Sequence, residues 1–261
     1  MSGPALISAP DSPLVADLFP SPNIESRFRG LKPTILVLHY TGLESVERSL
    51  DVLSRPDCKV SCHYVVDVDG RVIQMVAEEM RAWHAGLSSW HGETDINSAS
   101  IGIEIQNGGH ALGYPDFPEA QMRAVIGLSQ DICGRHGIAP ERVLAHSDIA
   151  PARKIDPGEK FNWARLAAEG VGFWLSPEPP DADDAGLGPG AETVEIAETR
   201  LLLARYGYGV AAEGPLDEEL GFVLRAFQLH FRPARVDRRL DRSTLVTLRR
   251  LVEALPNAEI A

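Results

Sequence analysis

A stretch rich in Pro, Gly, Asp and Ala, residues 177–191, divides the chain and so limits what it can fold into. Its sequence, PEPPDADDAGLGPGA, has neither helical nor strand periodicity and is typical of an extended, acidic linker. Residues 1–191, this stretch included, carry most of the net charge of -12, whereas the sequence that follows is nearly neutral, rich in arginine and free of lysine. We therefore predict a larger domain over 1–176, a linker over 177–191 and a small domain over 192–261.

The composition excludes several classes of protein. Lys and Arg total 25 against 37 Asp and Glu, so the surface lacks the basic footprint that nucleic-acid binding requires. No apolar run approaches the roughly 18 residues of a membrane span, and the N-terminal sequence has neither a basic region nor a continuous apolar one. The three cysteines are scattered, which is not a disulfide framework. We expect a soluble, cytoplasmic protein without a nucleic-acid or membrane partner.

The sequence before the linker alternates between strand and helix patterns. The apolar run 34–39 predicts a strand buried on both faces, and two short runs around Asp69-Gly70 predict a hairpin over 62–76. Further strands are expected at 100–107 and 142–146, and helices at 44–54, 118–136 and 161–170. This mixture predicts an α/β fold with a mixed central β-sheet flanked by helices.

The sequence after the linker predicts a small domain of three helices. They are expected at 192–205, 216–231 and 242–254. Apolar positions such as Leu220, Phe227 and Leu248 would line one small core. A module of this size is near the lower limit of independent stability.

Two histidines and one aspartate form a candidate metal site. His39 ends the run 34–39, His146 ends the predicted strand 142–146, and Asp156 follows ten residues later in a loop. Two imidazoles and one carboxylate are ligands of a catalytic Zn²⁺ site, whose open position activates a water molecule. From spacing alone, other interpretations stay open. A histidine at a strand end is often a hydrogen-bonded rim residue, and Asp156 before Pro-Gly is also typical of a turn.

Two charged residues are candidates for catalysis. Glu104 is the polar member of one face of the strand 100–107, where burying a carboxylate without a partner costs several kcal/mol. It is either a general base with a raised pKa or part of an exposed face or salt bridge. Lys154 lies two residues before Asp156 and would stabilise a developing oxyanion if it projects into the same site. A loop lysine is otherwise a solvated charge.

Residues near these motifs are candidates for substrate contact. Trp83 and His84 lie in the segment WHAG, which would offer an aromatic wall and an imidazole to a sugar or a peptide. A single tryptophan is otherwise typical of a core. His63 lies beside a buried strand and is a candidate for the groove or for the layer behind it. A zinc site made of Cys58, Cys62 and His63 is disfavoured, because no second pair of ligands follows.

In their order along the chain these motifs resemble the zinc-dependent N-acetylmuramoyl-L-alanine amidases of type 2, in particular the AmpD and AmiD branch. The segments that carry the resemblance are ILVLHYTG at 35–42, VSCHYVVDVDGRVIQMV at 60–76, RAWHAG at 81–86, INSASIGIEIQN at 96–107 and AHSDIAPARKIDPG at 145–158. The resemblance implies one zinc ion held by His39, His146 and Asp156. It also implies Glu104 as general base and Lys154 as the group that stabilises the transition state.

The resemblance implies a substrate as well. Such an enzyme hydrolyses the amide between N-acetylmuramic acid, or its anhydro form, and L-alanine in muropeptides, here for cytosolic peptidoglycan recycling. Tyr40, where recycling members often have asparagine, is a further candidate for substrate contact. The alternatives are a recognition protein that binds fragments without cutting, a wall-remodelling amidase outside the cytoplasm, and a zinc peptidase that cuts within the stem peptide. The complete set of candidate ligands, with Glu104 and Lys154, favours an enzyme over a recognition protein.

The C-terminal segment resembles a small peptidoglycan-binding domain. The match is carried by RYGYGV at 205–210, LRAFQLHFRP at 224–233 and VDRRLDRSTLVTL at 236–248. The usual Asp-Gly of that motif is Asp237-Arg238 here. The alternative is a helical appendage that stabilises the larger domain.

Overall fold

The computed structural model describes residues 6–256, and residues 1–5 and 257–261 at the ends of the two predicted domains lie outside the described residues. The strands are β1 (Asp17–Leu18), β2 (Ile24–Ser26), β3 (Ile35–Tyr40), β4 (Tyr64–Val66), β5 (Val72–Gln74), β6 (Met80–Ala82), β7 (Ser100–Ile105) and β8 (Val143–Ala145). The helices are α1 (Val46–Ser54), α2 (Ile96–Ala99), α3 (Glu119–His136), α4 (His146–Ile149), α5 (Trp163–Ala168), α6 (Val194–Tyr206), α7 (Glu218–Phe231) and α8 (Arg242–Glu253). Within residues 6–256, no helix has the length and apolar character needed to cross a lipid bilayer.

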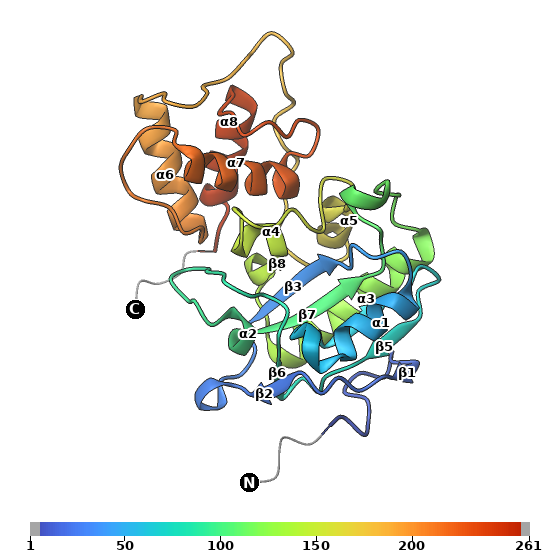
Figure 1. Cartoon of the computed structure of the whole chain (residues 1–261). Coiled ribbons are helices and arrows are strands. Elements are labelled where there is room, and N and C mark those ends of the chain that lie inside the picture. The colour runs from blue at the N-terminus through green and yellow to red at the C-terminus, as the bar shows by residue number, and fades with distance from the viewer. Residues whose placement is uncertain (1–5, 257–261) are drawn as a thin grey trace.

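Six strands form one mixed sheet in the order β1-β5-β4-β7-β3-β8 (Figure 1). β3 lies parallel between β7 and β8, whereas β4 is parallel to β7 and antiparallel to β5. The predicted mixed α/β fold is confirmed, including the hairpin that turns at Gly70. The sequence did not predict β1 or the separate pair β2–β6, because strands of two or three residues are too short to show a periodicity.

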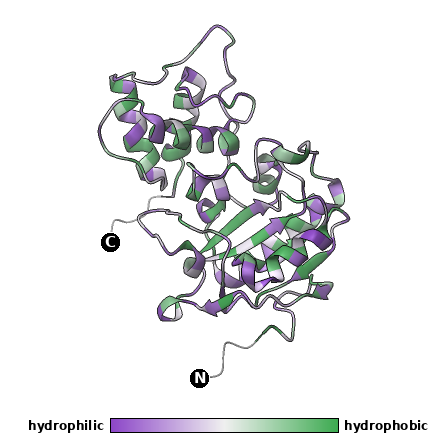
Figure 2. Cartoon of the chain, viewed as in Figure 1, coloured by the Kyte–Doolittle hydropathy of each residue, from purple (hydrophilic) through white to green (hydrophobic). Residues whose placement is uncertain are grey.

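One face of the sheet packs on α3. Ile101 and Ile103 of β7 meet Val125 of α3 in a buried cluster, and Figure 2 shows the central strands as mostly hydrophobic. The helix begins directly after Pro118 and ends at Gly137, which adopts the left-handed conformation that glycine accepts at a helix end. The predicted helix over 118–136 is therefore confirmed.

The other face of the sheet has two covers. Over β4 and β5, α1 packs Leu50 against Val65. Over β3 and β8, Val37 and Leu144 join a cluster that continues through Ile149 into the C-terminal helices. The C-terminal ends of β3 and β7 lie between these two covers, and the candidate site is built there.

Helices α6, α7 and α8 confirm the three helices expected after residue 191. Leu220, Phe227 and Leu248 are buried together, as the sequence predicts. The same apolar cluster includes Trp90 and Ile149 from the larger part of the chain. The two parts therefore share one core.

A buried carboxylate also joins the two parts. Asp148 of α4 accepts hydrogen bonds from Tyr208 Oη (2.6 Å) and from His230 Nδ1 (2.7 Å). His230 also stacks on Trp163 of α5, with ring centroids 3.7 Å apart. These contacts fix α7 against α4 and α5.

Residues 177–191 pack along the C-terminal helices. The backbones of Leu187 and Leu240 exchange hydrogen bonds of 2.8 and 3.0 Å. Arg235 donates to the carbonyl of Asp184 (2.7 Å). The composition indicated an extended linker, but it could not reveal that arginines of the following segment hold the stretch in place. The domain boundary at this stretch stays a prediction.

Candidate metal centre and active-site pocket

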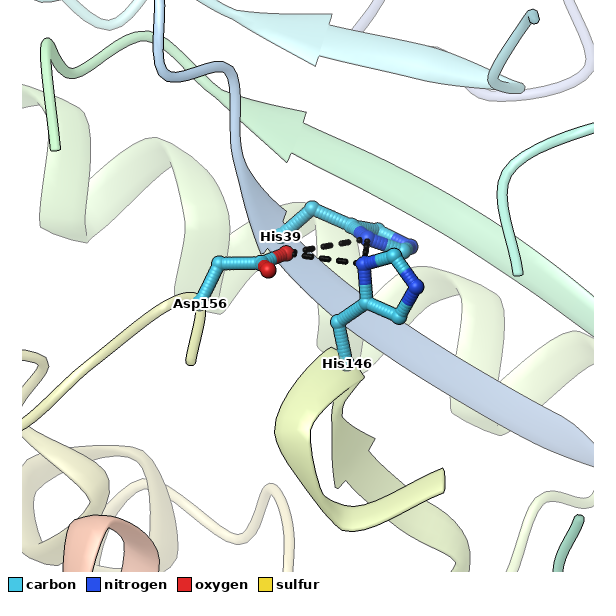
Figure 3. A group of neighbouring side chains, drawn as sticks. All are labelled: His39, His146 and Asp156. Carbon is cyan, nitrogen blue, oxygen red and sulfur yellow. Dashed lines mark hydrogen bonds and ion pairs between the residues drawn. The ribbon is translucent and has the colours of Figure 1, made fainter. Parts of the chain in front are cut away.

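Three residues from separate elements bring ligand atoms together at one edge of the sheet (Figure 3). His39 lies near the end of β3, His146 opens α4 directly after β8, and Asp156 lies in the loop between α4 and α5. β3 and β8 are parallel neighbours, so their carboxyl ends meet. The sequence placed His146 within the strand. The strand instead ends at Ala145, whose N–H donates to Asp148 (2.8 Å) and so caps the short helix.

The three ligand atoms lie at distances that suit a small metal ion. His39 Nδ1 and His146 Nδ1 are 2.8 Å apart, and they lie 3.3 and 2.9 Å from Asp156 Oδ2. With metal–ligand distances of about 2.0–2.1 Å, the ligand atoms of a tetrahedral zinc site lie about 3.3 Å apart. Two imidazoles and a carboxylate are also a donor set of catalytic zinc. The residues present therefore fit a zinc ion with one open position.

The surroundings of His39 and Asp156 favour the protonation states that metal binding needs. Burial, together with the nearby His146, lowers the pKa of His39 to about 4, so the ring is neutral at neutral pH. Burial alone would raise the pKa of Asp156, but His146 and His39 outweigh it and hold that pKa well below its usual value. A neutral imidazole and an ionised carboxylate are the forms that bind metal.

Glu104 lies beside the candidate metal ligands. It is the register partner of His39 across the β3–β7 pair, so both side chains project from the same face of the sheet. Among the described residues, its buried Oε2 has no hydrogen-bond partner. Burial raises the pKa of Glu104 well above its usual value, Asp156 raises it further, and the charge of Lys154 opposes the rise. A raised pKa makes such a carboxylate a stronger proton acceptor than an exposed one.

A pocket of about 400 Å³ opens over these groups. Its lining includes most of the candidate site residues from the sequence: Tyr40, Trp83, His84, Glu104, His146, Lys154 and Asp156. The apolar part of the wall comes from α1 and the segment after it, including Val52, Leu53 and Val60. The structure therefore places an acidic group, an amine, aromatic rings and two of the three candidate metal ligands around one cavity.

Lys154 and Trp83 present polar groups without a partner in residues 6–256, whereas Tyr40 is held by a neighbouring side chain. Lys154 is half-buried, and its amine makes no hydrogen bond or ion pair among residues 6–256. Trp83 likewise has a buried indole N–H with no partner in the described part of the chain. Tyr40 is fixed instead, because its Oη lies 3.1 Å from His110 Nδ1. Burial and the charge of Asp156 raise the pKa of Tyr40, so it stays a neutral phenol.

His63 does not reach the pocket. Its side chain is fully buried, its Nδ1 accepts from the N–H of Gly102 (3.0 Å), and its Nε2 faces the carbonyl of Met80 (3.1 Å) and the guanidinium of Arg27 (3.1 Å). The hypothesis that His63 contacts substrate is therefore not supported by its position. Its partners are far away in the sequence, so proximity to the motif was misleading.

Several residues of the site were missed by sequence reasoning. His110 stacks on Tyr114 (ring centroids 4.1 Å) and links Tyr40 to Glu159, at 3.0 Å from His110 Nε2. A 3₁₀ turn after β7 places His110 there, and no spacing in the sequence signals it. Arg153 lines the pocket, whereas His110 lies beside it, and the place of Arg153 next to Lys154 in the loop was an available signal.

Comparison with known proteins decides the family. Residues 29–159 match the family model described as N-acetylmuramoyl-L-alanine amidase. The chain belongs to this amidase family. As one of these amidases it is a hydrolase of a linear amide bond, and the family predicted from the sequence is confirmed. The match ends before the C-terminal helices, so their resemblance to a peptidoglycan-binding domain stays a prediction.

Two relatives and one solved structure show how far the similarity extends. The N-acetylmuramoyl-L-alanine amidase AmiD of Escherichia coli K12 is 40% identical over 231 residues, which are 84% of this chain and 82% of AmiD. The 1,6-anhydro-N-acetylmuramyl-L-alanine amidase AmpD of Enterobacter cloacae is 36% identical over 166 residues, 57% of this chain and 87% of AmpD. The structure of E. coli AmiD in complex with the substrate anhydro-N-acetylmuramic acid-L-Ala-D-γ-Glu-L-Lys has a TM-score of 0.71 at 39% identity, covering 85% of this chain and 89% of AmiD.

Proposed function

We propose that this amidase uses one zinc ion to hydrolyse the amide bond between N-acetylmuramic acid, or its anhydro form, and L-alanine. The observation that carries the proposal is the convergence of His39, His146 and Asp156 beside a pocket lined by Glu104, whose buried Oε2 has no partner within residues 6–256. The substrate is supported by the AmiD complex with an anhydromuropeptide and by the activity for which AmpD is named.

The proposed chemistry divides between the metal and Glu104. His39, His146 and Asp156 would hold zinc, which supplies a Lewis acid and lowers the pKa of water towards 7. Glu104 accepts the proton of the attacking water, because its raised pKa favours the protonated form. It then returns that proton to the leaving amine as the C–N bond breaks. The sugar keeps the new carboxylate and the stem peptide leaves with a free amino group.

Three other pocket residues act on the substrate in this proposal. The amine of Lys154, free of ion pairs in the described residues, stabilises the oxyanion that forms when the carbonyl is attacked. Trp83 supplies an apolar wall and an indole N–H without a protein partner in residues 6–256. Tyr40, held by His110, is a fixed phenol at the rim of the same pocket.

Mass spectrometry of products tests the proposal. The purified protein is incubated with a defined anhydromuropeptide, with and without a chelator, and the masses released are identified. We expect a stem peptide that begins at L-alanine, and we expect the chelator to abolish its release. Products in which L-alanine stays on the sugar would indicate a zinc peptidase instead. Intact substrate with zinc-loaded protein would indicate a recognition protein.

The compartment in which the enzyme acts is a separate part of the proposal. We place the enzyme in cytosolic recycling of muropeptides, and cell fractionation followed by immunoblotting measures this directly. Recovery in the periplasm would favour the wall-remodelling alternative.

For the C-terminal helices we propose peptidoglycan binding, supported by a pocket of about 620 Å³ that includes Leu216, Asp237 and Arg238. Co-sedimentation of the full chain with insoluble peptidoglycan, comparing wild type with Arg238→Glu, measures that binding.

A further inference from the structure

The loop Trp83–Gly86 lies directly behind the candidate metal ligands. Asn97 of α2 fixes it, because the side-chain oxygen of Asn97 accepts hydrogen bonds from the backbone N–H groups of His84 (3.0 Å) and Ala85 (2.8 Å). The loop then offers one acceptor to each ligand histidine. His84 Nδ1 lies 3.0 Å from His39 Nε2, and the carbonyl of Ala85 lies 3.3 Å from His146 Nε2.

The hydrogen bonds around His84 settle which nitrogen of His39 carries its proton. The hydroxyl of Ser100 donates its one proton to the carbonyl of Ile96 (2.6 Å), so it can only accept from His84 Nε2 (3.2 Å). His84 therefore carries its proton on Nε2 and presents a bare Nδ1. Since a bare nitrogen accepts, His39 must donate from Nε2. This leaves the lone pair of His39 Nδ1 facing His146 and Asp156.

The second ligand histidine is fixed in the same way. The carbonyl of Ala85 is only an acceptor, so His146 Nε2 carries the proton and His146 Nδ1 is left with a lone pair. Arg153 Nη2 donates to the same carbonyl (2.9 Å) and holds it in place. Both imidazoles therefore present Nδ1 to the centre, the tautomer that a metal requires there.

The His84 ring fits against the sheet only because Gly102, the residue it packs against, has no side chain. Gly102 of β7 shares its face with Glu104, and a Cβ atom on Gly102 would lie 2.6 Å from His84 Cγ and Nδ1. Real Cβ atoms do not approach another atom so closely, so an alanine at 102 would displace the ring. This steric requirement is independent of the hydrogen-bond pattern and places His84 at the same point.

We propose that His84 is a positioning residue for the metal centre: held by Asn97 and admitted by Gly102, it sets the tautomer and orientation of His39. This assigns His84 a role other than the substrate contact expected from the sequence. The inference rests on the proposed function, because it takes the three ligands to hold a metal. Removing such a hydrogen-bond partner of a metal-binding histidine typically costs about 10- to 100-fold in metal affinity.

Competition of the full-length protein with a chromophoric chelator for Zn²⁺ alone tests the proposal without any substrate. We expect His84→Leu and Gly102→Ala each to weaken zinc binding by about 10- to 100-fold. His84→Asn, whose side-chain oxygen can accept from His39 at the position of Nδ1, should stay within about threefold of wild type. His91→Leu is the control, because His91 is exposed and, within residues 6–256, its ring contacts neither His84 nor a candidate ligand. Equal affinities for His84→Leu and wild type would overturn the proposal.

A second measurement needs no variant. Long-range ¹H–¹⁵N correlation spectra of the histidines report the tautomer of each ring in the zinc-loaded and in the metal-free protein. We expect the Nε2–H form for His39, His84 and His146 in the zinc-loaded protein, and the Nε2–H form for His84 in the metal-free protein as well. A His84 ring protonated on Nδ1 would overturn the inference. Failure of wild type to bind zinc would overturn the proposed function instead, and the spectra of the metal-free protein would still decide the role of His84.

Discussion

Glu104 is an acidic side chain whose surroundings favour its protonated form, and it lies across the strand pair from His39. We expect Glu104→Gln to lower kcat by about 10²- to 10⁴-fold, because the amide cannot accept the proton that the carboxylate takes. Zinc affinity should change little, since Glu104 is not one of the three ligands. Steady-state rates on a defined anhydromuropeptide and the zinc content after dialysis are the two measurements. Loss of bound zinc with the activity would place Glu104 among the metal ligands instead.

The stability of the fold should depend on pH through Glu78. Burial alone would raise the pKa of this carboxyl, but hydrogen bonds from Arg135, Tyr64 and His136 outweigh it and lower the pKa to about 2. A lowered pKa stabilises the fold above the unfolded value near 4.5, and this contribution is lost as the pH falls towards 2. At one pKa unit per 1.36 kcal/mol, it amounts to about 3 kcal/mol at pH 7 and about half of that at pH 3.

Urea unfolding of Glu78→Gln at pH 7 and pH 3 measures this contribution. The difference in unfolding free energy between wild type and variant should shrink as the pH is lowered. Glu79→Gln is the matched control, because Glu79 is exposed and its loss should change stability by less than about 0.5 kcal/mol. A pH-independent difference would show that the hydrogen bonds of Glu78 act without its charge.

Strand alternation explains why some site residues could be predicted and others could not. His39 and Glu104 lie at the polar positions of otherwise apolar strands, so their residue types alone mark them. His63 is also a histidine beside a strand, but its role depends on Arg27, 36 residues earlier, which no local pattern reveals. The contact between Tyr40 and His110 could not be predicted either, because the two residues lie 70 positions apart in the sequence.

At the scale of single elements, the hairpin turn between β4 and β5 offers a test of how tightly the sheet packs on α3. Gly70 has a φ of 90°, and a Cβ atom there would lie 2.7 Å from the carbonyl oxygen of Ala120. Gly137 at the end of α3 also has a positive φ, of 66°, but open space surrounds its Cβ position. Gly137→Ala should cost about 1–2 kcal/mol from backbone strain alone. Gly70→Ala should cost about 1–3 kcal/mol more.

Chemical denaturation of the two variants compares these costs directly. Equal losses would mean that the turn can move away from α3 without penalty.

The long elements, such as β7 and α3, were predictable because their side chains repeat often enough to show a period. The helix α4 was not, because its four residues are fixed by Asp148 and by contacts with α7.

Across the whole molecule, the two parts of the chain are joined by Asp148 and by a shared apolar cluster. Tyr208→Phe removes the hydroxyl that donates to Asp148 Oδ1 and leaves that buried oxygen without its partner, so it should cost about 1–3 kcal/mol. Tyr206→Phe is the control, because the hydroxyl of Tyr206 makes no hydrogen bond within residues 6–256. Calorimetry should show one unfolding transition, lowered in Tyr208→Phe. Two separate transitions would contradict the shared core.

The short helix α4 carries His146 at its first residue and Asp148 two residues later, and Asp148 is held by Tyr208 and His230 from the far end of the chain. A shortened version that ends at residue 176 would keep every candidate ligand and still lose both of these partners. It would also expose Trp90 and Ile149, now covered by the C-terminal helices, to water. An engineer who wants a minimal catalyst from this sequence would therefore have to redesign the surface around α4 before removing the tail.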